Sequence, residues 1–313
     1  DLKAYGIHFD NWFSEKSLHK DGSIKKVLDE LILKDLAYEK DGALWFRSTK
    51  FGDDKDRVVR KKDGTLTYIA ADIAYHENKF KRGFDLLVDV LGQDHHGYVK
   101  RLKATMQALG YNADNLNVIL YQLVTIKKGQ EALRMSKRSG TFVTLRDVID
   151  TVGKDVARFF YLNRKVDAHL EFDLDVALKK TDENPVYYIQ YAYVRTGSLI
   201  EKAKDDKLLN LFVNNLNLRE VENFFGDAEI SILKKITAFQ DVLNAIALGY
   251  HPHMLAYYSS ELAHRFHNYY SNNRIINLQN IDQSKARLFI TYLIRNCFDI
   301  CLDLLGLTKP ERM

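Results

Sequence analysis

The pattern of apolar and polar positions changes near residue 182, and this change divides the chain into two kinds of structure. Before it, short apolar runs alternate with helical stripes, whereas after it each long segment repeats its apolar residues at helical spacing. We therefore predict an α/β region over residues 1–181 and a separate all-α bundle over residues 182–313.

Residues 1–63 predict a small α+β module made of a helix and a hairpin. The expected elements are a helix at 24–34, capped by Ser23, and two strands at 36–39 and 43–47 joined by Asp41-Gly42. The charged stretch at 51–57 predicts a solvated loop, and cation binding by its acidic residues is the alternative.

Residues 64–181 predict a strand–helix–strand unit. The expected elements are helices at 69–80 and 98–109, strands at 86–91 and 117–126, a helix capped by Thr144 with Asp147 as its third residue, and a helix at 156–164 capped by Asp155. The apolar run at 86–91 is typical of a buried parallel strand.

Residues 182–313 predict helices with no strand between them. The first is opened by the N-cap Asn184 and by Pro185. The predicted helices cover residues 185–204, 206–224, 228–248, 253–272 and 282–305. Cys297 and Cys301 lie on one face of the last helix, a poor geometry for a disulfide, and free thiols indicate a reducing, cytoplasmic compartment.

The composition is that of a globular chain, since 46% of the 313 residues are hydrophobic and 28% are charged. No apolar run is long enough to span a bilayer, and we expect no signal peptide. The net charge is only +4, but residues 121–170 hold ten Lys/Arg against five Asp/Glu. This local excess favours a polyphosphate or nucleic-acid surface, with an ordinary lysine-rich exterior as the alternative.

Tyr68 and Asp72 are four residues apart and face the same way if the helix begins at Tyr68. A carboxylate beside a phenol can hold a guanidinium group, because the acid pairs with the planar fork and the ring packs on it or bonds to it. A half-exposed helix face without a ligand is the alternative.

Gln93, Asp94, His95, His96 and Gly97 follow the predicted strand at 86–91. Ligands of open α/β sheets bind beyond the carboxyl ends of strands, so these polar residues are candidates for hydrogen bonding to a ligand. Metal binding is the weaker hypothesis, since adjacent histidines rarely share one ion and no further ligand with zinc spacing follows.

The sequence LRMSKRSG at residues 133–140 suits gripping a phosphate, because one flexible lysine, Lys137, is flanked by Ser and Gly. A solvated basic turn is the alternative. The string resembles the KMSKS signature loop of class I aminoacyl-tRNA synthetases, with Arg134 in place of the first lysine.

Three further strings resemble arginyl-tRNA synthetases: YIAADIAYH at 68–76, GQDHHGY at 92–98 and NPVYYIQYA at 184–192. The order of the parts and the ending PERM also resemble that family. The resemblance implies an α/β partial nucleotide-binding (Rossmann-like) catalytic domain with a small α+β insertion, followed by an all-α anticodon-binding domain of the DALR type. It implies an insertion module at 1–63, the second half of the catalytic domain at 64–181 and the anticodon-binding domain at 182–313.

The resemblance also implies roles for single residues. The expected sites are Tyr68, Asp72 and Gln93 for arginine; His96, Gly97, Met135 and Lys137 for ATP; Lys137 and Ser136 for catalysis, with Arg138 as a further loop residue; and Tyr188, Tyr191 and Met313 for tRNA. The implied function is an arginine–tRNA ligase that acts on arginine, ATP with Mg²⁺ and tRNA(Arg). A cytoplasmic monomer without a protein-bound metal is expected.

The chain departs from the family because it lacks the His-x-Gly-His signature and the N-terminal tRNA-binding domain. We therefore expect a C-terminal portion of a ligase that does not form arginyl-adenylate by itself. The first alternative is a non-catalytic RNA-binding module derived from a synthetase. The second is a cysteinyl enzyme, which would need zinc-ligand cysteines in its catalytic half.

Overall fold

The computed structural model describes residues 1–129, 131–132 and 143–313. Its contacts divide the chain into two compact units, which are described separately below. One unit is Phe9–Leu123, and the other joins Asp1–His8 to Val124–Met313. These divisions differ from the expected domain limits at residues 63 and 181, which stay predictions.

The unit Phe9–Leu123 begins with helices and a three-stranded antiparallel sheet. Its elements are α1 (Glu15–Lys20), α2 (Ser23–Leu33), β1 (Ala37–Lys40), β2 (Ala43–Phe46), the short helix η1 (Ser48–Phe51) and β3 (Arg57–Arg60). Asp41 and Gly42 both have positive φ, as a two-residue hairpin turn requires. The predicted cap at Ser23 is wrong, because Gly22 is the N-cap and Ser23 is the first helical residue.

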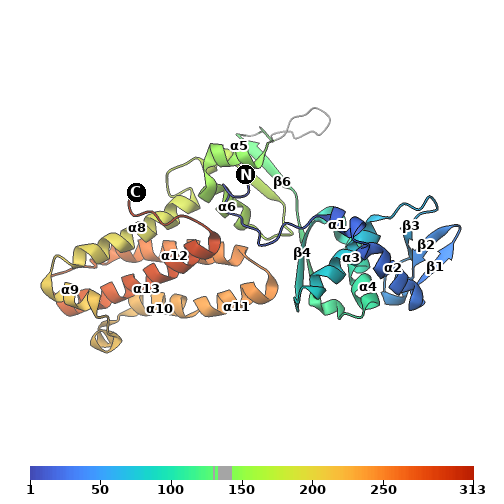
Figure 1. Cartoon of the computed structure of the whole chain (residues 1–313). Helices are drawn as coiled ribbons and strands as arrows, with labels where there is room; N and C mark the ends of the chain where they lie inside the picture. The colour runs from blue at the N-terminus through green and yellow to red at the C-terminus, as the bar shows by residue number, and fades with distance from the viewer. Residues whose placement is uncertain (130, 133–142) are drawn as a thin grey trace. The chain divides into compact units, whose positions relative to one another are not determined.

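A parallel strand–helix–strand unit completes Phe9–Leu123 (Figure 1). Its elements are α3 (Tyr68–Lys81), β4 (Leu87–Gly92), η2 (Gln93–Tyr98), α4 (Val99–Leu109), η3 (Ala113–Asn115) and β5 (Leu116–Tyr121). Leu87 and Leu116 pack with Leu102 and Met106 of α4 on one face of the pair. Val88 and Val90 are 40% and 60% exposed, so the expectation of a strand buried on both faces is wrong for β4.

The predicted single strand at 117–126 is two strands in different sheets. β5 ends at Tyr121, and β6 (Val124–Lys128) pairs with β7 (Glu131–Ala132) and β8 (Leu170–Asp173). The helices nearby are α5 (Leu145–Val152), α6 (Lys154–Leu162) and α7 (Leu174–Ala177). The cap at Thr144 is confirmed as a reciprocal capping box with Asp147. The cap at Asp155 is wrong: α6 begins at Lys154, and Asp155 accepts hydrogen bonds from Gln190 and Thr308.

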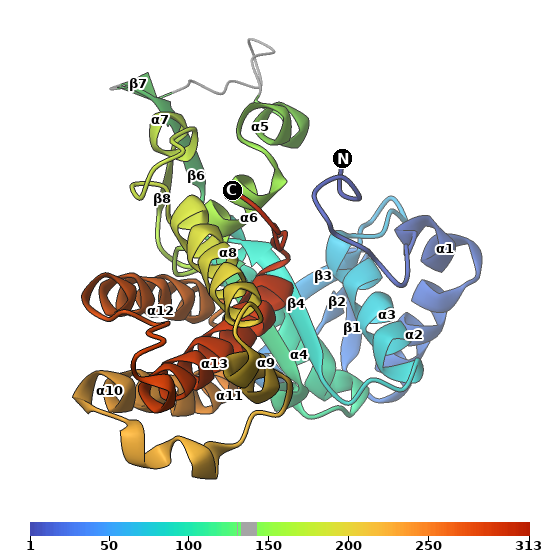
Figure 2. The same cartoon turned by 90° about the vertical axis from the view of Figure 1, so that its left-hand side faces the viewer.

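The C-terminal part is helical, with α8, α12 and α13 packed against one another (Figure 2). Its helices are α8 (Pro185–Ala203), α9 (Lys207–Asn214), α10 (Asp227–Thr237), α11 (Phe239–Gly249), α12 (His253–Asn272) and α13 (Ile281–Leu305). Asn184 caps α8 as predicted. The segments expected at 206–224 and 228–248 are each interrupted, since α9 gives way to short 3₁₀ turns and α10 is separate from α11. Cys297 and Cys301 are free and buried in the helical core, as expected.

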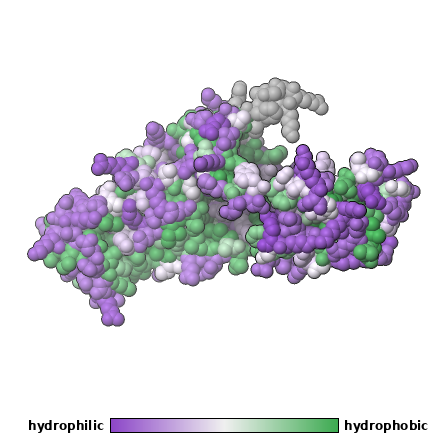
Figure 3. Space-filling model, viewed as in Figure 1, coloured by the Kyte–Doolittle hydropathy of each residue, from purple (hydrophilic) through white to green (hydrophobic). Residues whose placement is uncertain are grey.

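None of the described helices is long and apolar enough to cross a membrane. The face seen in Figure 3 mixes hydrophilic and hydrophobic residues, with hydrophobic residues gathered over parts of the helical region. Leu248, at the end of α11, is one of the large apolar side chains that reach solvent.

Candidate functional site

A half-buried carboxylate in the unit Phe9–Leu123 is the first candidate site. Asp72 lies in the second turn of α3, where the helix has begun at Tyr68 as the four-residue spacing required. The phenol of Tyr98, at the end of η2, donates a hydrogen bond to Oδ2 of Asp72. Burial raises the pKa of Asp72, and the hydrogen bond from Tyr98 opposes that rise. The arrangement is a desolvated anion whose hydrogen-bond partner is neutral.

The helix that carries Asp72 is tied to β4 by buried polar groups. His76 is 2% exposed; its Nδ1 lies 2.8 Å from the carbonyl oxygen of Asp72 and its Nε2 lies 2.7 Å from Oδ2 of Asp89. Lys79 donates to Oδ1 of Asp89 over 2.6 Å. Burial alone would raise the pKa of Asp89, but His76 and Lys79 lower it to about 2. These contacts hold α3, and with it Asp72, at a set position against the strand.

The other residues expected at this site lie near Asp72 in sequence or along η2, in more open surroundings. Tyr68 is 87% exposed, although it shares the helical face predicted for it and Asp72. Gln93, His96 and Gly97 belong to η2 and are exposed at the carboxyl end of β4. Because η2 ends at Tyr98, the hydrogen bond from Tyr98 to Asp72 brings this loop beside the carboxylate. Sequence reasoning assigned no role to Tyr98, and its place directly after the polar loop was the only signal.

The residues of the proposed phosphate-binding loop lie outside the described part of the chain. They are Arg134, Met135, Ser136, Lys137 and Arg138. Their expected roles toward ATP and in catalysis stay predictions.

The acidic residues considered for cation binding are used within the protein. Asp53 is buried and accepts two hydrogen bonds from Arg57, over 2.7 and 2.8 Å, and a third from Ser48. Asp54, which is exposed, contacts the same guanidinium. Asp53 is therefore neither solvated, as the sequence predicted for its loop, nor free to hold a cation.

Among the described residues, no group of three or more His, Cys, Asp or Glu side chains is placed to hold a metal ion. His95 Nε2 lies 3.9 Å from Asp94 Oδ2, and both side chains are largely exposed. His95 and Asp94 therefore make only a long electrostatic contact. The expectation that the protein carries no resident metal stays a prediction.

A second candidate site is an aromatic and cationic surface between α8 and α12. Tyr188 and Tyr191 both contact the ring of His267, with centroids 4.3 and 5.7 Å apart. The guanidinium of Arg195 lies 4.3 Å from the ring centre of Tyr191 and 4.4 Å from that of Tyr270. Flat rings next to a cation can stack on unpaired bases and attract the phosphates between them.

The family resemblance named the two tyrosines of this surface as candidates, and sequence reasoning gave no role to Arg195, His267 and Tyr270. The position of Arg195, four residues after Tyr191 on the same helix, was an available signal. His267 and Tyr270 come from α12, so only the packing of two helices places them here. Burial lowers the pKa of His267, which leaves Arg195 as the positive group of the surface at neutral pH.

The C-terminal tail lies along α8. Thr308 bonds to Gln190 through its carbonyl oxygen, and the tail then borders a cavity of about 590 Å³. The cavity is lined by Val194, Gly197, Ser198, Ile200, Glu201, Arg295, Pro310, Glu311 and Arg312. Met313 is 48% exposed at the end of this tail, and its expected contact with RNA stays a prediction.

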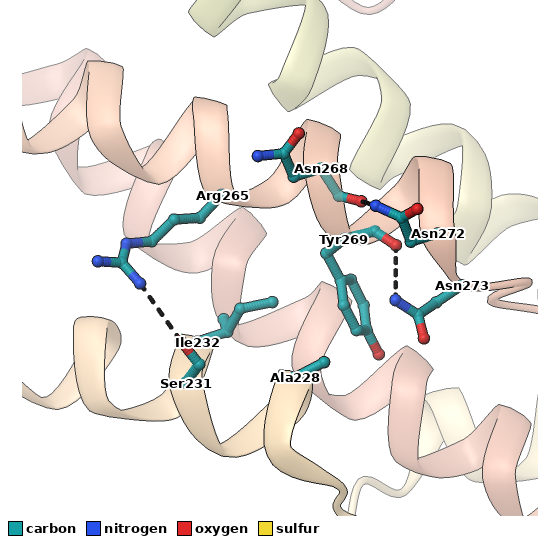
Figure 4. A pocket seen from close by; sticks show the side chains of 8 residues that line it. All are labelled: Ala228, Ser231, Ile232, Arg265, Asn268, Tyr269, Asn272 and Asn273. Carbon is teal, nitrogen blue, oxygen red and sulfur yellow. Dashed lines mark hydrogen bonds between the residues drawn. The ribbon is translucent and has the colours of Figure 1, made fainter.

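A smaller groove of about 290 Å³ lies between α10 and α12 (Figure 4). Arg265 reaches across it to Ser231 over 3.3 Å, while Asn272 and Asn273 donate to helix carbonyls. The guanidinium and amide groups that line this groove offer polar contacts, and no carboxylate, histidine or cysteine is among its lining residues.

Two family models match separate parts of the chain. Residues 7–169, more than half of the chain, match the model of tRNA synthetases class I (R), catalytic domain, and residues 189–313 match the DALR anticodon binding domain. The chain belongs to the arginyl-tRNA synthetase family. The family and the fold class predicted from the sequence are thereby confirmed.

Curated relatives of this family cover the whole chain. Over 313 residues it is 44% identical to the arginine–tRNA ligases of Citrifermentans bemidjiense and Geobacter sp. (strain M21). The chain spans 56% of each of these relatives, a little over half their length.

Solved structures show the same fold. A Campylobacter jejuni structure assigned to the arginyl-tRNA synthetases matches all of this chain with a TM-score of 0.87 and 32% identity, and the match covers 66% of that structure. The Thermus thermophilus arginyl-tRNA synthetase matches all of the chain with a TM-score of 0.78 and 19% identity, over 62% of its own length. At that identity the second match supports the fold alone.

Proposed function

We propose that this chain supplies the second part of the catalytic domain and the anticodon-binding domain of an arginine–tRNA ligase. The observation that carries the proposal is the half-buried carboxylate of Asp72, which within the described residues has a neutral phenol rather than a lysine or arginine as its partner. A planar, permanently charged guanidinium matches the geometry and charge of such a site.

The proposed reaction has two steps. The carboxylate of arginine attacks the α-phosphorus of ATP and expels pyrophosphate, and the terminal ribose hydroxyl of tRNA(Arg) then attacks the acyl carbon. Tyr68, Asp72 and Gln93 hold the arginine in this proposal, and Mg²⁺ enters with ATP. The protein contributes mainly positioning and neutralisation of phosphate charge.

ATP lies beyond the end of β4 in this proposal. His96 and Gly97 border its adenosine, Met135 and Lys137 contact it from the signature loop, and Lys137 with Ser136 stabilises the triphosphate during the attack. A cytoplasmic monomer with no resident metal completes the proposal. The proposed ATP site is supported by the match to the class I catalytic domain and by the exposed polar residues of η2.

A chimera tests the proposed activity. The part of the Citrifermentans bemidjiense ligase that lies outside the matched region is joined to this chain, and arginine-dependent ATP–pyrophosphate exchange is measured. We expect exchange by the chimera and none by the 313 residues alone, because these residues lack the His-x-Gly-His signature that the family implies. A well-folded chimera that binds tRNA(Arg) but lacks exchange would favour the non-catalytic RNA-binding alternative.

The surface between α8 and α12 is proposed to bind the anticodon loop, with Tyr188, Tyr191 and Met313 in contact with RNA. Replacing Tyr191 with alanine is expected to raise the Kd for tRNA(Arg) about tenfold, since stacking of one base is worth ~1–3 kcal/mol. Filter binding at one fixed salt concentration measures the effect, because affinity for RNA depends on salt.

Two variants control for loss of the ring and for nonspecific damage. Tyr191→Phe keeps the ring and is expected to retain most of the affinity. Tyr292→Ala removes an exposed tyrosine from α13 and is expected to leave the Kd unchanged. An unchanged Kd for Tyr191→Ala would remove this surface from the RNA interface.

A further inference from the structure

Tyr98 connects the loop at the end of β4 to the carboxylate on α3. Its hydroxyl donates to Oδ2 of Asp72, which lies 26 residues earlier in the chain. Burial and the neighbouring Asp72 raise the pKa of the Tyr98 phenol, so it remains protonated and keeps donating over the physiological pH range. Tyr98 is therefore the donor of this hydrogen bond and Asp72 is its acceptor.

The charged groups that act on Asp72 are His76, which lowers its pKa, and Glu15 and Asp89, which raise it. The two arginines near Tyr98 do not form ion pairs with Asp72. Arg101 lies over the Tyr98 ring, 5.5 Å from its centre, and Arg57 is held by Asp53 and Asp54. In the part of the chain that the structure describes, no lysine or arginine forms an ion pair with Asp72. The negative charge of Asp72 is thus left for a ligand.

A carboxylate has about four sites for accepting hydrogen bonds on its two oxygens. The phenol occupies one site on Oδ2, and within the described residues Oδ1 has no hydrogen-bond partner. We propose that Tyr98 is a positioning residue for substrate recognition, which orients the Asp72 carboxylate so that Oδ1 and the free site on Oδ2 accept the two parallel N–H bonds of a guanidinium. This proposal rests on the proposed function.

Tyr98→Phe removes the hydroxyl and keeps the ring. In the chimera, we expect the KM for arginine to rise about tenfold, since a hydrogen bond to a charged group is lost. The KM for ATP and the kcat for exchange should stay within about twofold, because the change concerns only the side chain that contacts arginine. Tyr111→Phe, which alters a tyrosine stacked on Phe80 in the same unit, is the matched control and should change none of these values.

A second readout separates positioning from general damage. Because the Tyr98 hydrogen bond favours the ionised form of Asp72, its loss should raise the pKa of that carboxyl. Arginine binds the ionised form, so the acid limb of kcat/KM for arginine should move to higher pH in Tyr98→Phe. An unchanged arginine KM, or equal increases for arginine and ATP, would overturn the proposal.

The carboxyl of Asp72 can also be titrated by ¹³C NMR in the 313-residue chain, without catalysis. If the unmodified chimera shows no exchange, the proposed function fails, yet a raised Asp72 pKa and weaker binding of the probe methylguanidinium in Tyr98→Phe would still support positioning by Tyr98. An unchanged Asp72 pKa in this titration would overturn the positioning role whatever the chimera does.

Discussion

Replacing Asp72 with asparagine is expected to lower kcat/KM for arginine roughly 10²–10³-fold in the chimera, while the KM for ATP changes little. Asparagine has nearly the same shape as aspartate but lacks the charge that pairs with a guanidinium. Removing one partner of a desolvated, hydrogen-bonded charge pair costs about 2–5 kcal/mol, which corresponds to this range. ATP–pyrophosphate exchange at varied arginine and ATP measures both quantities.

The matched control is Asp85→Asn, which neutralises an exposed carboxylate in the same unit. This variant should keep wild-type kinetics for both substrates. An Asp72→Asn enzyme that loses ATP and arginine use equally would indicate a damaged fold, and full arginine activity would remove Asp72 from the substrate pocket.

Replacing Asp53 with alanine is expected to destabilise the unit Phe9–Leu123 by about 3–5 kcal/mol. The side chain of Asp53 is 1% exposed and that of Arg57 is 10% exposed, so the variant leaves a buried guanidinium without its main partner. The bonds from Arg57, the Asp54 N–H and Ser48 outweigh the effect of burial and hold the pKa of Asp53 well below its ordinary value. The folded state therefore requires the ionised carboxylate.

Asp54→Ala provides a close comparison, because Asp54 contacts the same guanidinium with a side chain that is 70% exposed. An exposed ion pair is worth about 0–1 kcal/mol, so this variant should be nearly as stable as the wild type. Both tryptophans, Trp12 and Trp45, lie in Phe9–Leu123, and urea titration followed by their fluorescence reports on this unit. Equal stability losses for the two variants would contradict the importance assigned to burial.

Several elements follow directly from local patterns. Asn184 opens α8, Thr144 and Asp147 form a capping box, and the paired positive φ values of Asp41 and Gly42 make the hairpin. In each case the residues that determine the structure are neighbours in sequence. Their side chains or φ preferences act within one turn, so no distant contact is needed.

The elements that the sequence predicted wrongly depend instead on contacts between residues that are distant in the chain. The apolar run through residues 117–126 does not reveal that β5 and β6 pair with different partners, because an apolar residue is buried equally well in either sheet. Similarly, the charges at 51–57 do not reveal which one is buried. Asp53 becomes internal only when β3 forms and brings Arg57 to it.

Local spacing along the chain is enough to indicate the division into α/β and helical parts and the candidate pair Tyr68 and Asp72. The resemblance of short strings to a known family indicates the family itself and the candidates Tyr188 and Tyr191. The folded chain alone decides that Tyr98 bonds to Asp72, that His76 ties α3 to Asp89, and that His267 and Tyr270 join Arg195 and Tyr191. These partners lie from 13 to more than 70 residues apart. Contacts over such separations depend on how whole elements pack, which periodicity and spacing do not encode.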